Sequence, residues 1–305
     1  MAKVGYQPDY LGKQHNFDLP TITFEHASDV VTSDDLREGQ LLDYPNYSVV
    51  MSRAKRQAFF SAGNADFSKN DGKGRNFRVD GRIDKILQLD NMYYKKLDGI
   101  DNPYDRGHLM RRDAISWGAT QKLANKASKD SCFYPNVSPQ HMNFNQDEWR
   151  ALEHAIEITN MDEDNRFNIF VGPVFTELDR FITPRSSMEP ARVPSAFWKI
   201  IVYIGKSSQN LEANAFLVWQ DDESLKAKKH VFGNNQINPF KIYQCSTTLI
   251  EELTGIEFPE IAFRTNPMFF FESDLTRSQN IDTPQLNEVS TAKGADCGII
   301  FEPMN

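Results

Sequence analysis

The stretch Asp105-Arg106-Gly107-His108 brings a carboxylate, a cation and an imidazole together within four residues. Two further polar segments follow it, at residues 136–140 and 145–153. Asn145 and Glu153 of the second segment add a carboxamide and a carboxylate. Together these side chains offer a base, a cation and oxygen ligands. Cleavage of a phosphodiester by water beside a divalent metal requires this set of groups.

Three residues of the tetrapeptide have a chemical reason to be there. His108 can act as the base, because a neutral imidazole titrates near the working pH. Arg106 lies two residues earlier, so on an extended strand it shares a side with His108 and can donate to a phosphate oxygen. Gly107 between them would let a substrate backbone approach closely.

Residues 146–158 are predicted to form a helix, because large apolar residues recur at helical spacing: Trp149, Leu152 and Ile156. Asn145 and Glu148 at its start resemble a capping box. Asn145 and Glu153 lie at the start of this helix and two turns into it, so their side chains project along related faces. One carboxamide ligand leaves most of a metal's shell to water and phosphate, which suits Mg²⁺, with Mn²⁺ as the alternative.

Each of these residues also has an ordinary structural explanation. His108 could be structural, Asn145 could be only a helix N-cap, Glu153 could be a solvated helix residue, and Arg106 could simply pair with Asp105. The functional interpretation depends on their co-occurrence, since all four structural explanations would have to hold together.

The charge of the chain is unevenly distributed. The formal net charge of −8 is unfavourable for an acidic partner, yet residues 50–130 hold 17 basic and 10 acidic side chains. The positive charge therefore lies around the tetrapeptide, where a polyanion would need it. The three cysteines form neither a disulfide framework nor a paired zinc motif, and no apolar run reaches the length of a membrane span or an export signal.

Runs rich in β-forming residues predict a sheet. Residues 47–51 and 57–60 flank a basic turn and predict a hairpin, and further strands are expected at 168–171, 197–204 and 213–219. The run 197–204 is apolar almost throughout, as in a central strand. Residues 64–75 are expected to form a loop, 117–130 a loop with a helical turn, and 248–254 a short helix that stops at Gly255. A strand is expected to reach the tetrapeptide.

This organisation predicts an α+β fold with a central antiparallel sheet flanked by helices. We divide the chain into an irregular N-terminal arm at 1–43, a catalytic domain at 44–265, and an irregular tail at 266–305 that packs on the domain. No internal repeat or linker divides it further.

The sequence resembles the DNA/RNA non-specific endonucleases of the ββα-metal, or His-Me finger, superfamily, and within it the endonuclease G-like proteins of bacteria. The resemblance includes the Asp105 to His108 signature, residues 136–140, and the segment from Asn145 to Glu153. It extends through residues 44–48, 62–66, 77–83, 172–175, 193–199 and 253–255, and covers about residues 44 to 260.

The resemblance implies a ββα-metal finger and a set of roles. His108 would be the general base, Asn145 the one direct protein ligand of the metal, and Arg106 the donor to the transition state. Glu153 would hold metal-bound water, and the supporting residues would be Asp105 and Asn136. The products would carry 5′-phosphates and 3′-hydroxyls.

The chain departs from the commonest family pattern at residues 110–113. Arg111 and Arg112 stand there, and we expect them to contact substrate phosphates. The expected function is therefore metal-dependent cleavage of DNA and RNA with little sequence specificity. Two alternatives stay open: a non-catalytic nucleic-acid-binding protein on the same fold, and a phosphodiesterase for small molecules.

A general nuclease without a visible export signal endangers its own cell. We therefore expect control by an inhibitor or immunity protein or by assembly into a homodimer, or a role as a toxin or anti-phage defence effector. The expected location is the cytoplasm or, through a secretion system that needs no signal peptide, outside the cell. No membrane partner is expected.

Overall fold

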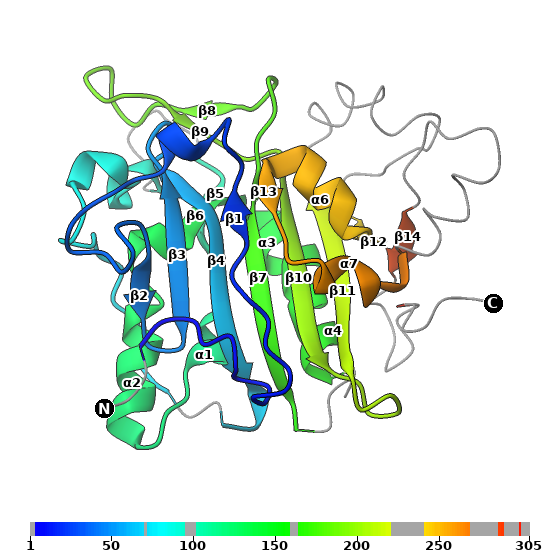
Figure 1. The fold of residues 1–305 in the computed structure, drawn as a ribbon. Coiled ribbons are helices and arrows are strands. Elements are labelled where there is room, and N and C mark those ends of the chain that lie inside the picture. The colour runs from blue at the N-terminus through cyan, green and yellow to red at the C-terminus, as the bar shows by residue number, and fades with distance from the viewer. Residues whose placement is uncertain are drawn as a thin grey trace, which may run out of the picture.

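The computed structural model describes residues 4–69, 72–94, 102–158, 164–220, 241–268, 286–289 and 299. A single large antiparallel sheet runs through it, with helices on one side and a mixture of loops and helices on the other (Figure 1). The predicted α+β class and central antiparallel sheet are confirmed.

The central sheet has the strand order β14-β12-β11-β10-β7-β4-β3-β2. Its strands are β2 (Leu42–Tyr44), β3 (Tyr47–Ser52), β4 (Gln57–Asp66), β7 (Arg166–Val174), β10 (Ala196–Ile204), β11 (Leu211–Trp219), β12 (Ile242–Cys245) and β14 (Asn287–Val289). Separate two-stranded pairs are β1 (Thr21–Ile22) with β13 (Ile256–Glu257), β5 (Tyr104–His108) with β6 (Val137–His141), and β8 (Phe181–Ile182) with β9 (Ala191–Arg192).

The predicted hairpin and the three later strands are confirmed by β3, β4, β7, β10 and β11. β10 lies between β7 and β11, and all but its last residue are buried, as its apolar run predicts. The expected loop at 64–75 is wrong at its start. Asn64 to Asp66 continue β4, because Asn64 is buried and its Nδ2 donates to Asn168 Oδ1 of β7 at 2.8 Å.

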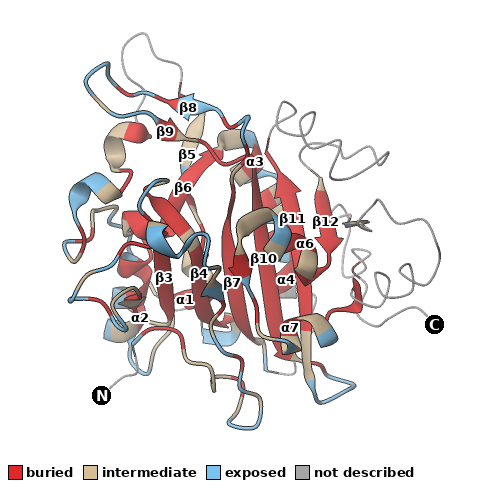
Figure 2. Ribbon diagram, turned by 45° about the horizontal axis from the view of Figure 1, so that its top comes forward, coloured by how far each residue is buried: buried red, intermediate tan, exposed pale blue. Residues whose placement is uncertain are grey.

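The sheet has an apolar core on each face. On one face it packs against α1 (Arg112–Ile115), α3 (Met142–Gln146) and α4 (Glu148–Ile158). On the other it packs against the N-terminal segment, α6 (Thr247–Thr254) and α7 (Ile261–Arg264). Figure 2 shows the strands as mostly buried between these two layers. α6 ends at Gly255 in a left-handed conformation, as predicted.

The N-terminal segment belongs to the second core. Its only strands are β1 and β2, yet Tyr6, Leu11 and Phe17 are buried against the sheet. The Tyr6 hydroxyl donates to the Phe17 carbonyl at 2.7 Å, which closes this segment on itself. The domain boundaries at 43 and 265 stay predictions. Most of the tail at 266–305 lies outside the described residues.

α2 (Gln121–Asp130) replaces the loop that was expected at 117–130. Thr120 caps its N-terminus, with the side-chain oxygen accepting from the Leu123 amide at 3.3 Å. The expectation was wrong because the buried face of this helix consists of small residues, Ala124, Ala127 and Ser128, rather than large apolar ones. Small residues produce little apolar periodicity in a sequence.

The predicted single helix at 146–158 is two helices. Asp147 separates α3 from α4 with the non-helical angles φ −107° and ψ −86°. α3 is tied to β5 by side-chain hydrogen bonds, whereas α4 packs its buried Trp149, Leu152 and Ile156 into the core beneath the sheet. These two docking directions require a bend at Asp147.

Candidate active site

The side chains of the tetrapeptide point to both faces of the β5–β6 pair. Arg106 lies opposite Pro139 and His108 opposite Val137 in the antiparallel ladder. Successive side chains of a strand point to opposite faces. Arg106 and His108 therefore share one face of β5, and Asp105 points to the other, toward the helix that follows β6.

His108 is partly exposed and packed on two sides. The Phe77 ring lies with its centroid 5.4 Å from the imidazole, and Cys132 Sγ lies 3.6 Å from Nε2. Burial, followed by the charges of Arg75 and Arg112, lowers the pKa of His108 from 6.5 to about 4. The imidazole is therefore neutral at physiological pH and able to accept a proton.

Asp105 fixes the side chains of the adjoining helix. Its Oδ2 accepts hydrogen bonds from Asn145 Nδ2 at 2.9 Å and from Gln146 Nε2 at 3.1 Å. Asn145 lies within α3, so its interpretation as part of a capping box is wrong. Because the amide nitrogen faces Asp105, the amide oxygen Oδ1 points elsewhere, and no hydrogen bond to it occurs within the described segments.

The donors around Asn145 suit a hard cation. Asn145 Oδ1 and the Asp105 carboxylate are oxygen donors of the kind that Mg²⁺ and Mn²⁺ prefer. The described part of the chain contains no group of three or more His, Cys, Asp or Glu side chains that could hold a metal. A metal here would take most of its shell from water and substrate. The expectation that Asn145 is its ligand stays a prediction.

Glu153 of α4 pairs with a lysine from the centre of the sheet. Lys199 Nζ donates to Glu153 Oε1 at 3.0 Å, and the Lys199 side chain is 3% exposed. Burial lowers the pKa of Lys199, and the Glu153 carboxylate opposes that shift. The ordinary explanation of Glu153 as a solvated helix residue is therefore wrong. Its carboxylate is held in one orientation.

The two arginines after the tetrapeptide have partners within the protein. Arg111 lies 3.0 Å from Glu157 Oε2 and 3.9 Å from Glu153 Oε2. Arg112 pairs with Asp113 at 2.8 Å. Contact with substrate phosphate stays a prediction for both residues, and for Arg111 it would compete with an existing cluster of carboxylates.

Arg106 is exposed and lies across an aromatic ring. Its guanidinium sits 4.4 Å from the Phe77 ring centroid, and its Nη1 donates to Asn91 Oδ1 at 3.1 Å. The expected alternative, a pair with Asp105, is not formed, because the two side chains point to opposite faces of β5. Phe77 thus packs against both Arg106 and His108 and fixes the spacing of cation and base.

Asn136 ties the segments around His108 together. Its fully buried side chain accepts from Ser61 Oγ at 3.0 Å and the Met110 amide at 2.9 Å. It donates to the carbonyls of Met110 and Ser131, both at 3.0 Å. Asn136 thus connects β4, the turn after His108 and the segment that carries Cys132 through hydrogen bonds, which is consistent with the supporting role expected for it.

Gly107 makes room for a neighbouring side chain. A Cβ atom at Gly107 would lie 2.0 Å from Gln140 Oε1 on the paired strand. The close approach that the glycine allows is therefore made by Gln140 and not, as expected, by a substrate backbone.

Residues 29–262 match the family of DNA/RNA non-specific endonucleases. The match spans well over half of the chain. The chain belongs to this family. A protein of Sinorhizobium fredii (strain NBRC 101917 / NGR234) described as uncharacterized protein y4fB is 30% identical over 275 residues, which are 85% of this chain and 39% of that protein. The chain therefore spans about two fifths of the length of this relative.

A solved structure supports the non-specific endonuclease fold. It is the EndoG/EndoGI complex, described as showing the mechanism of EndoG inhibition. The match has a TM-score of 0.50 and 17% identity, and it covers 72% of this chain and 84% of the other. At this identity the likeness establishes the fold alone. Within the described ranges, no helix of this family member is long and apolar enough to cross a membrane.

Sequence reasoning missed three residues around the candidate site. Phe77 lies far from the tetrapeptide in sequence, and the cysteines, Cys132 among them, were considered only for disulfides and for zinc. Lys199 carried a usable signal, because a lone charged residue within the apolar run of a central strand requires a buried partner. That signal indicates a partner but cannot identify Glu153.

Proposed function

We propose that this endonuclease-family protein is a metal-dependent hydrolase of DNA and RNA that cleaves with little sequence specificity and leaves 5′-phosphate and 3′-hydroxyl ends. One observation carries the proposal: a neutral, partly exposed His108 shares a strand with Asp105, which orients the Asn145 amide. The β5–β6 pair thus carries the base, His108, and also Asp105, which orients the oxygen ligand Asn145.

His108 and Arg106 would act from the same face of β5. The neutral imidazole takes a proton from the attacking water, a step that contributes on the order of 10² to 10⁴ in rate. The exposed guanidinium of Arg106 donates to a non-bridging phosphate oxygen as charge grows there. Loss of such a preorganised donor costs about 3 kcal/mol in the barrier.

Asn145 and Glu153 would act at the metal. Asn145 Oδ1 would hold the ion, and Glu153, oriented by Lys199, would accept hydrogen bonds from water around it. A bound Mg²⁺ or Mn²⁺ supplies a positive charge that stabilises the leaving oxygen. Asp105 keeps the amide in position through its bond from Nδ2.

The proposal is tested by nicking of a supercoiled plasmid and cleavage of a structured RNA with Mg²⁺ and with EDTA. We expect cleavage only with the metal, and loss of cleavage in His108→Ala with the unfolding midpoint and metal affinity of the parent. Equal cleavage by a folded His108→Ala would overturn the mechanism. Binding without cleavage would indicate a nucleic-acid-binding protein, and cleavage of small diesters alone a phosphodiesterase.

We propose further that the activity is restrained in the producing cell. The fold matches that of EndoG, whose solved complex concerns its inhibition. Restraint by an inhibitor or immunity protein, by assembly of a homodimer, or by delivery as a toxin or defence effector would meet this need. Induced expression in the cytoplasm tests it: growth arrest that His108→Ala abolishes is expected. Normal growth with a fully active, unrestrained enzyme would contradict it.

A further inference from the structure

A basic groove runs along α2. It has a volume of about 770 Å³, and the side chains that decide its charge are Arg78, Lys122, Lys126, Lys129 and Asp130. Asp130 is the one acid among its lining residues, and it is already paired with Arg78 and Lys126. The groove therefore carries an excess of positive charge that its own carboxylate does not neutralise.

The three lysines form a stripe on the helix. Their spacing of four and three residues places Lys122, Lys126 and Lys129 on one face of α2. All three are exposed, whereas Ala124 and Ala127 face the core. The stripe covers seven helical steps, or roughly 10 Å at about 1.5 Å per residue. Among the residues that line the groove, Asp130 is the one acid beside this lysine row, so the row keeps a net positive charge that suits a chain of phosphates.

One chain segment, residues 74–78, contributes both to the groove and to the surroundings of His108. Asn76 and Arg78 line the groove, and the residues between and beside them reach His108. Phe77 packs on the His108 ring, and the Arg75 charge contributes to the lowered pKa of His108. Lys129 lies against Gly74 of the same segment, where an added Cβ would be 3.0 Å from Lys129 Cε. The segment 74–78 thus links the lysine stripe to the base.

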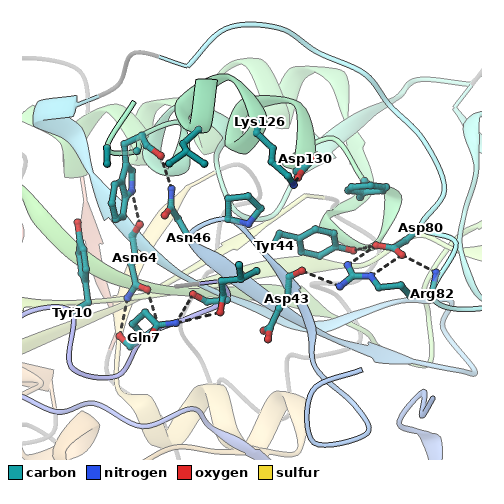
Figure 3. A pocket seen from close by; sticks show the side chains of 18 of the residues that line it. Gln7, Tyr10, Asp43, Tyr44, Asn46, Asn64, Asp80, Arg82, Lys126 and Asp130 are labelled. Carbon is teal, nitrogen blue, oxygen red and sulfur yellow. Dashed lines mark hydrogen bonds and ion pairs between the residues drawn. The ribbon is translucent and has the colours of Figure 1, made fainter. Parts of the chain in front are cut away.

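A neighbouring cavity has a different character. It has a volume of about 850 Å³ and lies between α2 and the N-terminal segment, sharing Lys126 and Asp130 with the groove (Figure 3). Its charges are mutually satisfied. Arg82 donates to Asp80 Oδ1 at 3.0 Å and Oδ2 at 2.7 Å, and Tyr44 also donates to Asp80. This cavity offers no unpaired cationic site, so an anion is attracted to the lysine stripe instead.

We infer that the stripe on α2 binds the sugar-phosphate backbone of a polynucleotide as it leaves the site at His108. This inference rests on the proposed nuclease function and adds a second contact region outside the catalytic residues. A stripe of roughly 10 Å covers about three nucleotide steps of 3.4 Å. Backbone contacts hold a substrate without reading its sequence. The stripe therefore favours long polymers over dinucleotide-sized diesters.

The test is a double variant, Lys122→Gln/Lys129→Gln, which leaves the Lys126–Asp130–Arg78 cluster intact. The matched control is Lys13→Gln/Lys206→Gln, two exposed lysines in the N-terminal segment and in the turn between β10 and β11. Fluorescence anisotropy in EDTA measures binding of a 30-nucleotide single strand and a 30-base-pair duplex from 50 to 300 mM NaCl. Cleavage of the same polymers and of bis(p-nitrophenyl) phosphate is measured with Mg²⁺.

Counterion release predicts the size of the change. Loss of two phosphate contacts should lower the slope of log K against log salt by about 1.8 for the duplex or about 1.4 for the single strand, and weaken binding roughly 10- to 100-fold at 0.1 M salt. KM for the polymers should rise, while the rate on the small diester stays unchanged. The control variant should keep the parental slope.

Three results would overturn the inference. They are an unchanged slope in the stripe variant, an equal loss in the control variant, and an equal loss of rate on the small diester and on the polymers. Failure of the nuclease proposal is a separate outcome: the parental protein would then bind nucleic acid with a salt dependence that the stripe variant reduces, but would not cleave it.

Discussion

The His108 Nε2 atom lies 3.6 Å from Cys132 Sγ, in a buried corner between α2 and β6. The thiol in turn lies 3.9 Å from the Ser128 carbonyl. With Nε2 directed at the sulfur, Nδ1 is the ring nitrogen directed away from it. The partner of one imidazole nitrogen sets which nitrogen carries the proton. Cys132 therefore positions the base.

We predict that Cys132→Ala lowers kcat about tenfold with little change in KM, the lower end of the effects seen when an orienting partner is lost. Cys132→Ser, which keeps a hydrogen-bonding atom, should retain most of the rate. Steady-state kinetics at saturating Mg²⁺ measures both variants, and thermal unfolding verifies that they are folded. Equal kcat for Cys132→Ala and the parent would rule out the positioning role.

The acid limb of the pH profile should lie far below the ordinary titration range of histidine. Catalysis needs neutral His108, so the rate is full above its pKa and falls as pH drops through it. Because burial and neighbouring arginines lower that pKa to about 4, we expect kcat/KM to stay nearly level from pH 7 to about 5. The measurement is kcat/KM from pH 4 to 8 with saturating metal. A midpoint near 6.5 would contradict it.

Stability should follow the same titration. The unfolded chain protonates His108 below pH 6.5, while the folded chain resists protonation down to about pH 4. Stability is therefore lost as pH falls through this window, by on the order of 3 kcal/mol in total. Urea unfolding of the parent and of His108→Gln at pH 7 and pH 4.5 isolates this contribution. An identical pH dependence of the two proteins would count against a lowered pKa of His108 in the folded protein.

Asp105 should govern metal affinity through Asn145. We predict that Asp105→Ala weakens binding of Mn²⁺ about 10- to 100-fold, because the Asn145 amide loses the bond that orients it. Calorimetric titration with Mn²⁺ reads this directly, without an activity assay. Gln146→Ala removes the other bond to Asp105 and serves as the control, since it leaves Asn145 held. Unchanged affinity in Asp105→Ala would place the metal elsewhere.

Local sequence pattern predicted the sheet because each strand carries its own signal. β10 is apolar almost throughout, and β3 and β4 flank a basic turn, so these elements were recognisable without tertiary information. α2 was missed because its buried alanines and serine give little contrast with its exposed lysines. A sequence pattern shows a helix through the spacing of its apolar residues. Small residues such as alanine and serine are only weakly apolar, so a helix that packs through them gives little periodic signal.

The sequence predicted which residues belong to the site but not which residues they contact. His108 and Asn145 follow from their residue types and spacing, yet the partner of Asn145 is 40 positions away and the partner of Glu153 is 46 away. Such contacts depend on how β5 and β10 are placed in three dimensions. The same holds for the bend at Asp147, where α3, which is tied to Asp105 of β5, gives way to α4.

The buried pair of Lys199 and Glu153 provides a test that separates stability from chemistry. Removing the cation in Lys199→Met leaves a mostly buried carboxylate for which Arg111, at 3.9 Å, is the one remaining cationic partner among the described residues. Breaking such a pair from one side should lower the free energy of unfolding by about 2 to 4 kcal/mol. Urea unfolding at pH 7 measures this loss.

Adding Glu153→Gln to Lys199→Met should restore much of the lost stability, because no unpaired buried charge remains. It should not restore cleavage, because a neutral amide accepts hydrogen bonds from water around a bound cation more weakly than a carboxylate does. The double variant would then be as folded as the parent but slow, with a raised requirement for Mg²⁺. Recovery of full activity together with stability would mean that Glu153 serves only to neutralise Lys199.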